Sequence, residues 1–243
     1  MVRNDKILFK VKNGVYSFYN VFIEGNFMLK GVIFDHDGLM FDTEKIWQKE
    51  WHIAAEKRNI VLSEKFPKDI GGTSGEKLLQ VIRFYFHTDE PEFIRQEVTK
   101  KVYQEEAEHL DAKKGLLEIL DMFQKNHIPM AVASSSPKEM IERNLKNAGV
   151  DYYFKVVVSG EEVERGKPYP DIFLRAADKL GIPAEECYVF EDAYNGIQAG
   201  HEAGCFTVMI PDRIAADEEM RKVADKVFDS LLLAKSWILS EEF

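Results

Sequence analysis

Three aspartates crowd the turn that follows a short apolar run. The stretch GVIFDHDGLMFDTE, residues 31–44, places Asp35, Asp37 and Asp42 behind the apolar residues 32–34. Carboxylates this close repel each other unless a cation or a proton lies between them. The turn therefore predicts that the aspartates hold either a cation or a proton between them. An EF-hand calcium loop does not fit, because such a loop needs glycine at its sixth position and glutamate at its twelfth.

Three further polar pieces follow apolar runs or lie beside them. Ser134 ends the run MAVAS, Lys167 lies in ERGKPYPDIF, and Glu191 and Asp192 end CYVFED. Each piece alone has an ordinary explanation: a helix N-cap, a solvated surface lysine, or an acidic first turn of a helix. In an open parallel sheet, however, ligands bind beyond the carboxyl ends of the strands. The order of the pieces therefore favours one shared site.

The elements that must position these residues are strands that alternate with helices. Apolar runs without polar alternation predict strands buried on both faces at 32–34, 130–133, 156–158, 188–190 and 206–210. Helical patterns lie between most of them, for example at 137–149 and 170–181, and both of these end in glycine. Strands that alternate with helices predict an α/β fold with a parallel sheet and right-handed crossovers.

One region breaks this alternation. Residues 45–110 carry helical patterns without a clear strand, so we expect a small all-helical cap domain inserted into a core made of residues 28–44 and 111–243. Such an insert can cover the strand ends like a lid. Asp42 is expected to shape the loop into the cap. Residues 1–27 form an N-terminal extension whose Asn-Gly pair at 13 and 14 predicts a hairpin.

Composition limits the classes of function. The chain has 243 residues, a formal net charge of -10 and a sequence pI of about 5.2. This acidity argues against binding of nucleic acid or of an anionic membrane surface. It does not exclude a phosphorylated substrate, because a bound cation can reverse the local sign of charge. With no long apolar run and no signal peptide, we expect a cytoplasmic enzyme whose Cys187 and Cys205 are buried thiols.

The four polar pieces together resemble the motifs of the haloacid dehalogenase-like (HAD) hydrolase superfamily. The closer resemblance is to its β-phosphoglucomutase-like phosphatase branch, from about residue 29 to the end of the chain. The phrases GKPYPDIF and VFEDAYNGIQA are near-standard versions of two of the motifs. The resemblance implies a Rossmann-like parallel sheet core with an inserted helical cap.

The resemblance also implies roles for individual residues. Asp35 matches the nucleophile of the family and Asp37 its general acid/base. Ser134 and Lys167 match the residues that bind phosphate, with backbone N–H groups near Ser135. The metal would be Mg²⁺, which prefers hard oxygen ligands. Its ligands would be Asp35, the backbone carbonyl of Asp37, and Asp192, with Glu191 either a further ligand or a support behind them.

This reading predicts a Mg²⁺-dependent phosphatase that hydrolyses a small sugar or nucleoside monophosphate through an aspartyl-phosphate. Its partner would be that metabolite, without nucleic acid or membrane, and the expected state is a monomer. Trp47 could contact the substrate or belong to the core of the cap. Thr73 could likewise contact sugar hydroxyls or end a helix.

The sequence departs from the mutases at the cap. The mutase arginine that grips a second phosphate corresponds to Gly75 or a near neighbour, and its early cap histidine corresponds to Trp47. Pro137 stands where the mutase has a lysine, although Lys77 or Lys138 could compensate. A sugar-phosphate mutase is therefore the alternative enzyme. A non-catalytic binding protein is a third reading, which the complete motif set disfavours.

Overall fold

A single parallel sheet forms the centre of the computed structural model, which describes residues 22–23, 27–71, 73, 75–212 and 215–241. Six strands pair in the order β5-β4-β3-β6-β7-β8, and every neighbouring pair is parallel. Their bounds are β3 Gly31–Phe34, β4 Met130–Ser134, β5 Phe154–Ser159, β6 Cys187–Glu191, β7 Phe206–Met209 and β8 Lys226–Val227. The predicted α/β fold with a parallel sheet is confirmed.

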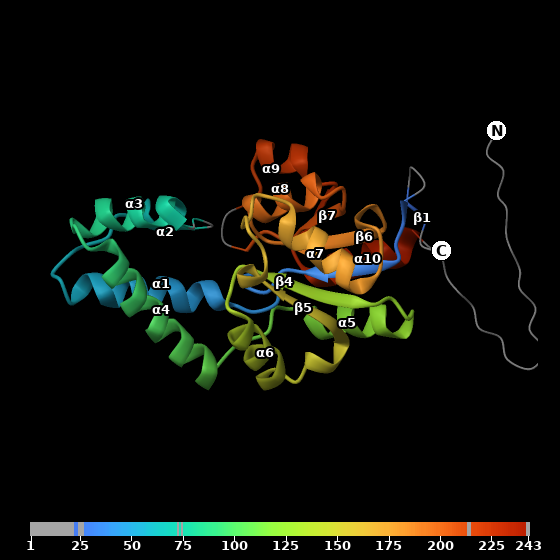
Figure 1. Cartoon of the computed structure of the whole chain (residues 1–243), viewed down its shortest axis with the longest axis horizontal. Coiled ribbons are helices and arrows are strands. Elements are labelled where there is room, and N and C mark those ends of the chain that lie inside the picture. Colours follow the sequence, from blue (N-terminus) through green and yellow to red (C-terminus); the bar gives the residue numbers. More distant parts are fainter. Residues whose placement is uncertain (1–21, 24–26, 72, 74, 213–214, 242–243) are drawn as a thin grey trace, which may run out of the picture.

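Helices cover both faces of this sheet (Figure 1). They are α5 Leu116–Lys125, α6 Lys138–Asn147, α7 Asp171–Leu180, α8 Tyr194–Glu202, α9 Glu218–Val223 and α10 Leu231–Glu241. Val32 and Phe34 pack with residues of α5, α6 and α10, while Ile33 packs with residues of α7 and α8. Adjacent side chains of a strand point to opposite faces, so this unbroken apolar run fills two cores at once.

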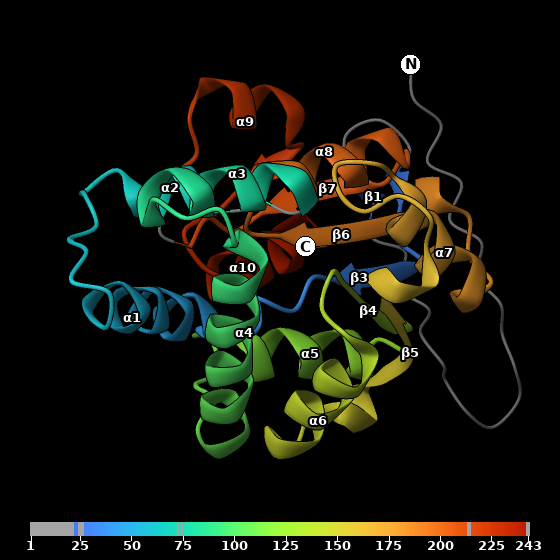
Figure 2. The same ribbon diagram turned by 60° about the vertical axis from the view of Figure 1, so that its left-hand side comes forward.

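A separate group of helices is inserted in the chain after β3 and before α5 and β4. It consists of α1 Thr43–Glu56, α2 Phe66–Ile70, α3 Gly75–Phe86 and α4 Pro91–Glu108. These helices share their own core, in which the Trp51 ring meets the rings of Phe66 and Phe86 at 6.0 and 5.9 Å between centroids. Figure 2 shows this group beside the carboxyl ends of the strands. The exact boundaries of a cap domain stay a prediction.

The two segments that join these helices to the sheet run side by side. The Asp42 N–H donates to the Asp111 carbonyl at 2.9 Å, and the Lys113 N–H donates to the Met40 carbonyl at 2.8 Å. Between these bonds, Phe41 and Ala112 form an antiparallel bridge. The Lys113 ammonium also pairs with the Asp42 carboxylate at 3.4 Å. Asp42 therefore does take part in the passage into the helical group.

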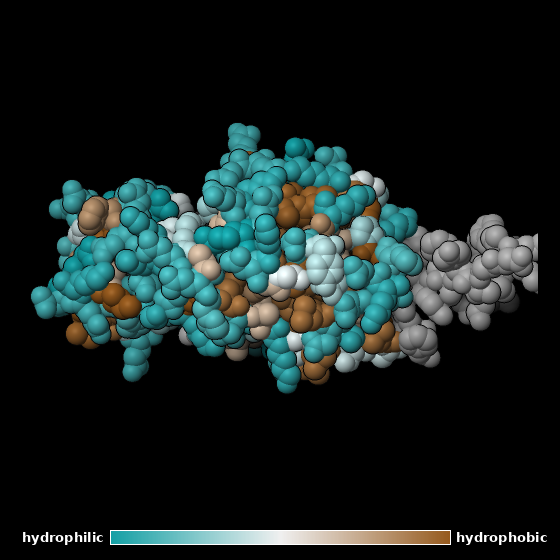
Figure 3. Space-filling model, turned by 90° about the horizontal axis from the view of Figure 1, so that it is seen from below, coloured by the Kyte–Doolittle hydropathy of each residue, from teal (hydrophilic) through white to brown (hydrophobic). Residues whose placement is uncertain are grey.

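Near the start of the chain, β1 Phe22–Ile23 pairs antiparallel with β2 Phe27–Met28. The hairpin expected around Asn13-Gly14 lies outside the described residues. No helix in the described part of the chain combines the length and apolar character needed to cross a membrane. The face seen in Figure 3 is mainly hydrophilic, with its hydrophobic residues in small separate patches.

Candidate active site

The strand order places the chemistry-bearing residues at one edge of the sheet. The chain runs outward from β3 to β4 and β5, then returns to the other side of β3 with β6. Such a reversal leaves a crevice at the carboxyl ends of the strands, where ligands bind in open α/β sheets. Asp35 directly follows β3, Ser134 ends β4 and Glu191 ends β6. All three therefore face the same crevice edge.

Three carboxylates meet at this edge. Asp35, Glu191 and Asp192 each offer an oxygen atom, and these oxygens lie within 4.8 Å of one another. Glycines make this approach possible. A side chain at Gly38, where φ is +78°, would lie 2.3 Å from the Asp192 carboxylate, and one at Gly196 would lie 1.7 Å from the Glu191 carboxylate. The loop after β3 and the start of α8 therefore need glycine to let the acids converge.

Lys167 is the cation within this acidic group. Its ammonium donates to Asp35 Oδ1 and Glu191 Oε1, each at 2.5 Å, and lies 3.3 Å from the Ala133 carbonyl. Its side chain is only 5% exposed. Burial alone would lower the pKa of Lys167, but Asp35 and Glu191 outweigh it and raise that pKa above its ordinary value. The lysine is therefore a fixed positive charge.

One lysine does not balance the acids. Burial, reinforced by Glu191 and opposed by Lys167, raises the pKa of Asp35 to about 7. Burial together with Glu191 and Asp35 raises the pKa of Asp192 well above its ordinary value. Both carboxylates would ionise more readily with another positive charge nearby. A cluster of hard oxygen donors whose negative charge exceeds its positive charge fits Mg²⁺.

The two oxygens of Glu191 are already occupied. Oε1 accepts from Lys167, and Oε2 accepts from the backbone N–H groups of Asp192 and Ala193 at 2.9 and 3.1 Å. Asp192, by contrast, is partly exposed and follows Glu191 directly. These bonds fix the Glu191 carboxylate in place, and its role as a metal ligand or as a support behind the ligands stays a prediction.

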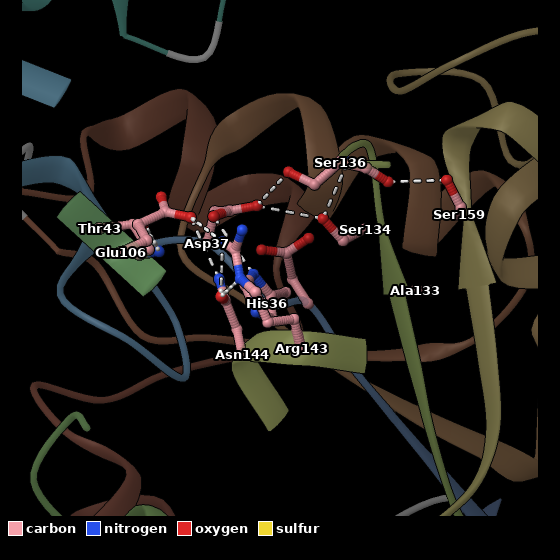
Figure 4. Close-up of polar contacts among 12 residues, drawn as sticks. His36, Asp37, Thr43, Glu106, Ala133, Ser134, Ser136, Arg143, Asn144 and Ser159 are labelled. Atoms are coloured by element: carbon pink, nitrogen blue, oxygen red, sulfur yellow. Dashed lines mark hydrogen bonds and ion pairs between the residues drawn. The ribbon is translucent and has the colours of Figure 1, made fainter. Parts of the chain in front are cut away.

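Asp37 lies beside the cluster and is held from two sides (Figure 4). Its Oδ2 atom accepts from the hydroxyls of Ser136 at 2.7 Å and Ser134 at 3.1 Å, while its Oδ1 atom lies 3.2 Å from Nδ1 of His36. Burial favours the neutral acid, but His36 and the two hydroxyls outweigh it and lower the pKa of Asp37 to about 2. In this arrangement Asp37 is an ionised carboxylate.

A family model described as haloacid dehalogenase-like hydrolase matches residues 32–210. The matched range includes each of these polar residues and covers more than half of the chain. The chain belongs to the haloacid dehalogenase-like hydrolase family. It is therefore an enzyme of the hydrolase class, as the sequence motifs predict.

Relatives of this HAD-like hydrolase carry phosphatase names. A fructose-1-phosphate phosphatase of Escherichia coli is 31% identical over 72% of this chain and 92% of its own length. A phosphorylated carbohydrates phosphatase of Thermotoga maritima is 29% identical over 72% of this chain and 82% of its own length. Among solved structures, the β-phosphoglucomutase of Clostridium difficile superposes with a TM-score of 0.72 at 25% identity, covering 88% of this chain and 97% of that one.

The HAD-like hydrolase has polar residues at this site that the sequence reasoning missed. Ser136 bonds Asp37, and Ser159 Oγ donates to the Ser136 carbonyl at 2.7 Å. Glu106 of α4 is 1% exposed, and its Oε2 atom accepts from the amide of Asn144 at 3.1 Å. Burial and then Asp37 raise the pKa of Glu106 to about 7. Ser136 could have been suspected from the sequence because it belongs to the serine triplet that begins with Ser134. No feature of the sequence distinguished Glu106.

The residues predicted for the substrate side have mixed surroundings. Ser135 is exposed at the end of β4. Trp47 is partly buried against the core of the helical group, and its ring meets that of Trp51 at 6.4 Å between centroids. The Thr73 hydroxyl donates to the Ile70 carbonyl at 2.7 Å. These contacts agree with a cap-core tryptophan and a helix-ending threonine, while contact with a substrate stays a prediction.

Proposed function

We propose that this HAD-like hydrolase is a Mg²⁺-dependent phosphomonoesterase that acts on a small phosphorylated metabolite. One observation carries the proposal: a buried lysine joins Asp35 to Glu191, beside Asp192, at the crevice where β3 lies between β4 and β6. The group brings together a carboxylate nucleophile, oxygen ligands for a metal and a fixed cation for a phosphoryl group. The phosphatase names of the relatives support the same reaction.

Asp35 and Asp192 would ligate the metal through their carboxylates and Asp37 through its backbone carbonyl, with Glu191 behind them. When bound, Mg²⁺ supplies positive charge that lowers the repulsion between the substrate phosphate and these acids. Lys167 and Ser134 would bind the phosphoryl oxygens, together with N–H groups near Ser135. Positive charge and donors placed there stabilise the transition state more than the ground state.

The reaction would proceed in two steps through Asp35. A carboxylate oxygen of Asp35 attacks phosphorus, the bond to the leaving oxygen breaks, and Asp37 gives that oxygen a proton. Water then attacks the aspartyl-phosphate, Asp37 takes the proton from that water, and phosphate leaves. The pKa of Asp37, lowered to about 2, favours its ionised form before the substrate binds. Arrival of the anionic phosphate next to it would raise its pKa and allow it to carry the proton.

Hydrolysis is favoured over phosphoryl transfer back to a sugar because the cap loop GGTSG, residues 71–75, contains no lysine or arginine. Lys77 is exposed on α3, and the Lys138 ammonium is engaged 3.6 Å from Glu162. A second phosphate would need cations to offset its desolvation. We therefore propose a sugar or nucleoside monophosphate as the substrate class, and the mutase reaction as the alternative.

A phosphate-release screen tests this function. The purified chain would be incubated with p-nitrophenyl phosphate and a panel of sugar and nucleoside monophosphates, with Mg²⁺ or with EDTA. We expect metal-dependent release from at least one substrate, and no useful conversion of glucose 1-phosphate to glucose 6-phosphate. Isomerisation faster than release would make the chain a mutase. No metal-dependent release from any substrate would favour a non-catalytic binding protein.

A further inference from the structure

A histidine is buried between the two aspartates of the first motif. His36 has no exposed surface, and its ring lies 5.1 Å from that of Phe41 between centroids. Neither of its ring nitrogens meets the geometry of a hydrogen bond with any described residue. A buried polar atom left without a hydrogen bond destabilises the folded state. An apolar side chain would avoid this cost, so packing alone does not explain a histidine here.

The position of the ring relative to Asp37 suggests what it does. Nδ1 of His36 lies 3.2 Å from Oδ1 of Asp37, within ion-pair distance although outside hydrogen-bond geometry. The opposite oxygen, Oδ2, accepts from Ser136 and Ser134. Figure 4 shows the imidazole on one side of the carboxylate and the serine hydroxyls on the other. The two oxygens of Asp37 are thus in different surroundings, and His36 adjoins the one turned away from the serines.

Glu106 adds a second acid to the same buried group. It belongs to α4, whereas His36 belongs to the loop after β3, and Asn144 and Arg143 of α6 hold its Oε2 atom at 3.1 and 3.8 Å. Its Oε1 atom is buried without a hydrogen-bond partner among the described residues. A buried polar atom without a partner requires an explanation, such as a catalytic role or a bound water or ion. Asp35 and Asp37 from the loop after β3 and Glu106 from the helical group all act electrostatically on His36.

We propose that His36 is a positioning residue for Asp37. By holding Oδ1, the imidazole turns Oδ2 toward Ser134 and Ser136, which border the expected phosphate site. Oδ2 is then the oxygen that gives a proton to the leaving group. This inference rests on the proposed function, because it assigns the proton transfer of that reaction to one oxygen atom of Asp37.

The dependence of rate on leaving group tests the inference. Phenol is a poor leaving group that needs a proton from Asp37, whereas p-nitrophenol leaves readily without one. In His36→Gln and His36→Leu, kcat/KM for phenyl phosphate should fall at least about tenfold more than kcat/KM for p-nitrophenyl phosphate. His52→Gln is the control, since His52 bonds the Gln48 carbonyl within α1. Equal losses on both substrates, or no loss, would overturn the inference.

Nuclear magnetic resonance tests the contact between His36 and Asp37 without any need for turnover. The ring ¹⁵N resonances of His36, recognised by their absence from His36→Gln, should shift in Asp37→Asn, while those of His52 stay in place. Unshifted His36 resonances would refute the contact even if the His36 variants fold poorly. If the unsubstituted chain releases phosphate from neither aryl phosphate nor any sugar or nucleoside monophosphate of the screen, the proposed function has failed and the catalytic part of the inference falls with it. The nitrogen shifts still report whether His36 contacts Asp37.

Discussion

The Lys167 ammonium lies 2.5 Å from Oδ1 of Asp35, and both side chains are nearly withdrawn from solvent. The lysine comes from a loop 132 residues further along the chain and reaches the end of β3 from outside the sheet. A cation held there lowers the cost of burying the Asp35 carboxylate. It also lies where a phosphoryl group attached to Asp35 would need positive charge.

Replacement of this lysine should damage both stability and activity. Lys167→Met leaves Asp35 and Glu191 buried without their cation, and breaking a buried pair from one side costs about 3–5 kcal/mol. We expect the free energy of unfolding to fall by about 3 kcal/mol at pH 8 and kcat/KM to fall at least about 10²-fold. Urea unfolding and phosphate release measure the two effects.

A surface ion pair provides the control for Lys167. Arg165 lies 2.8 Å from Asp171 with 55% of its side chain exposed. Such pairs contribute about 0–1 kcal/mol, so Arg165→Gln should change stability little. A loss in Lys167→Met no larger than that in Arg165→Gln would show that the buried lysine is not what stabilises the acids.

Asp35→Asn should remove turnover while the fold remains. An amide cannot form the aspartyl-phosphate, so phosphate release should drop below detection. The substitution also removes one of the three converging carboxylates, so far-ultraviolet circular dichroism and the melting temperature should indicate a folded chain. Appreciable turnover by the folded variant would exclude Asp35 as the nucleophile.

Metal binding should strengthen as pH rises through 7. The pKa of Asp35 is raised to about 7 in the metal-free protein, so below that pH Mg²⁺ must displace a proton. The proton of Asp35 alone makes the apparent affinity about tenfold weaker at pH 6 than at pH 8, and the raised pKa of Asp192 adds to this dependence. Melting curves at increasing Mg²⁺ measure this, and Asp192→Asn should reduce the shift strongly. An affinity that is the same at both pH values would argue against Asp35 as a ligand.

Glu106→Gln should change how stability depends on pH. The pKa of Glu106 is raised from 4.5 to about 7 in the folded protein, so the folded state binds its proton more tightly than the unfolded state. The stability that this group contributes is therefore lost as pH rises toward 7 and slightly beyond. Relative to the unsubstituted chain, Glu106→Gln should gain about 1 kcal/mol between pH 6 and pH 8.5.

The neighbouring residue gives a matched comparison for Glu106. Glu105 directly precedes Glu106 on the same helix and pairs with Lys49 at 2.7 Å, with 31% of its side chain exposed. Urea unfolding of Glu105→Gln should show a nearly constant difference from the unsubstituted chain at both pH values. If Glu106→Gln behaves in the same way, Glu106 is not the buried acid that the structure describes.

The strands that could be predicted from the sequence are those with apolar side chains on both of their faces. Val32, Ile33 and Phe34 fill the cores on both sides of the sheet, so the run carries no polar residue and stands out in the sequence. β8 Lys226–Val227 lies at the edge and is partly exposed. It has no apolar run, and the sequence offered no sign of it.

Some residues of the candidate site could likewise be predicted from the sequence, and others could not. Asp35, Ser134 and Glu191 could be placed together because each comes at the end of a predicted strand, and parallel strands end at one edge. Glu106 could not, because it lies in QEEAEH among acids that look alike in the sequence. What distinguishes it from Glu105 is the direction in which α4 turns it, toward Asn144 of α6. That direction depends on how two helices pack, which a local pattern does not contain.

The pairing of residues 40–42 with 111–113 has a consequence for how such an enzyme can change over evolution. The entry and exit of the four-helix insert lie next to each other, so the sheet needs only two adjacent attachment points, whatever their sequence separation. The entropy of closing a loop between fixed ends grows slowly with its length. Inserts of different size and sequence can therefore be exchanged at this junction without altering the strands that carry the acids. New substrates can be acquired by remodelling one appendage while the reaction centre is inherited unchanged.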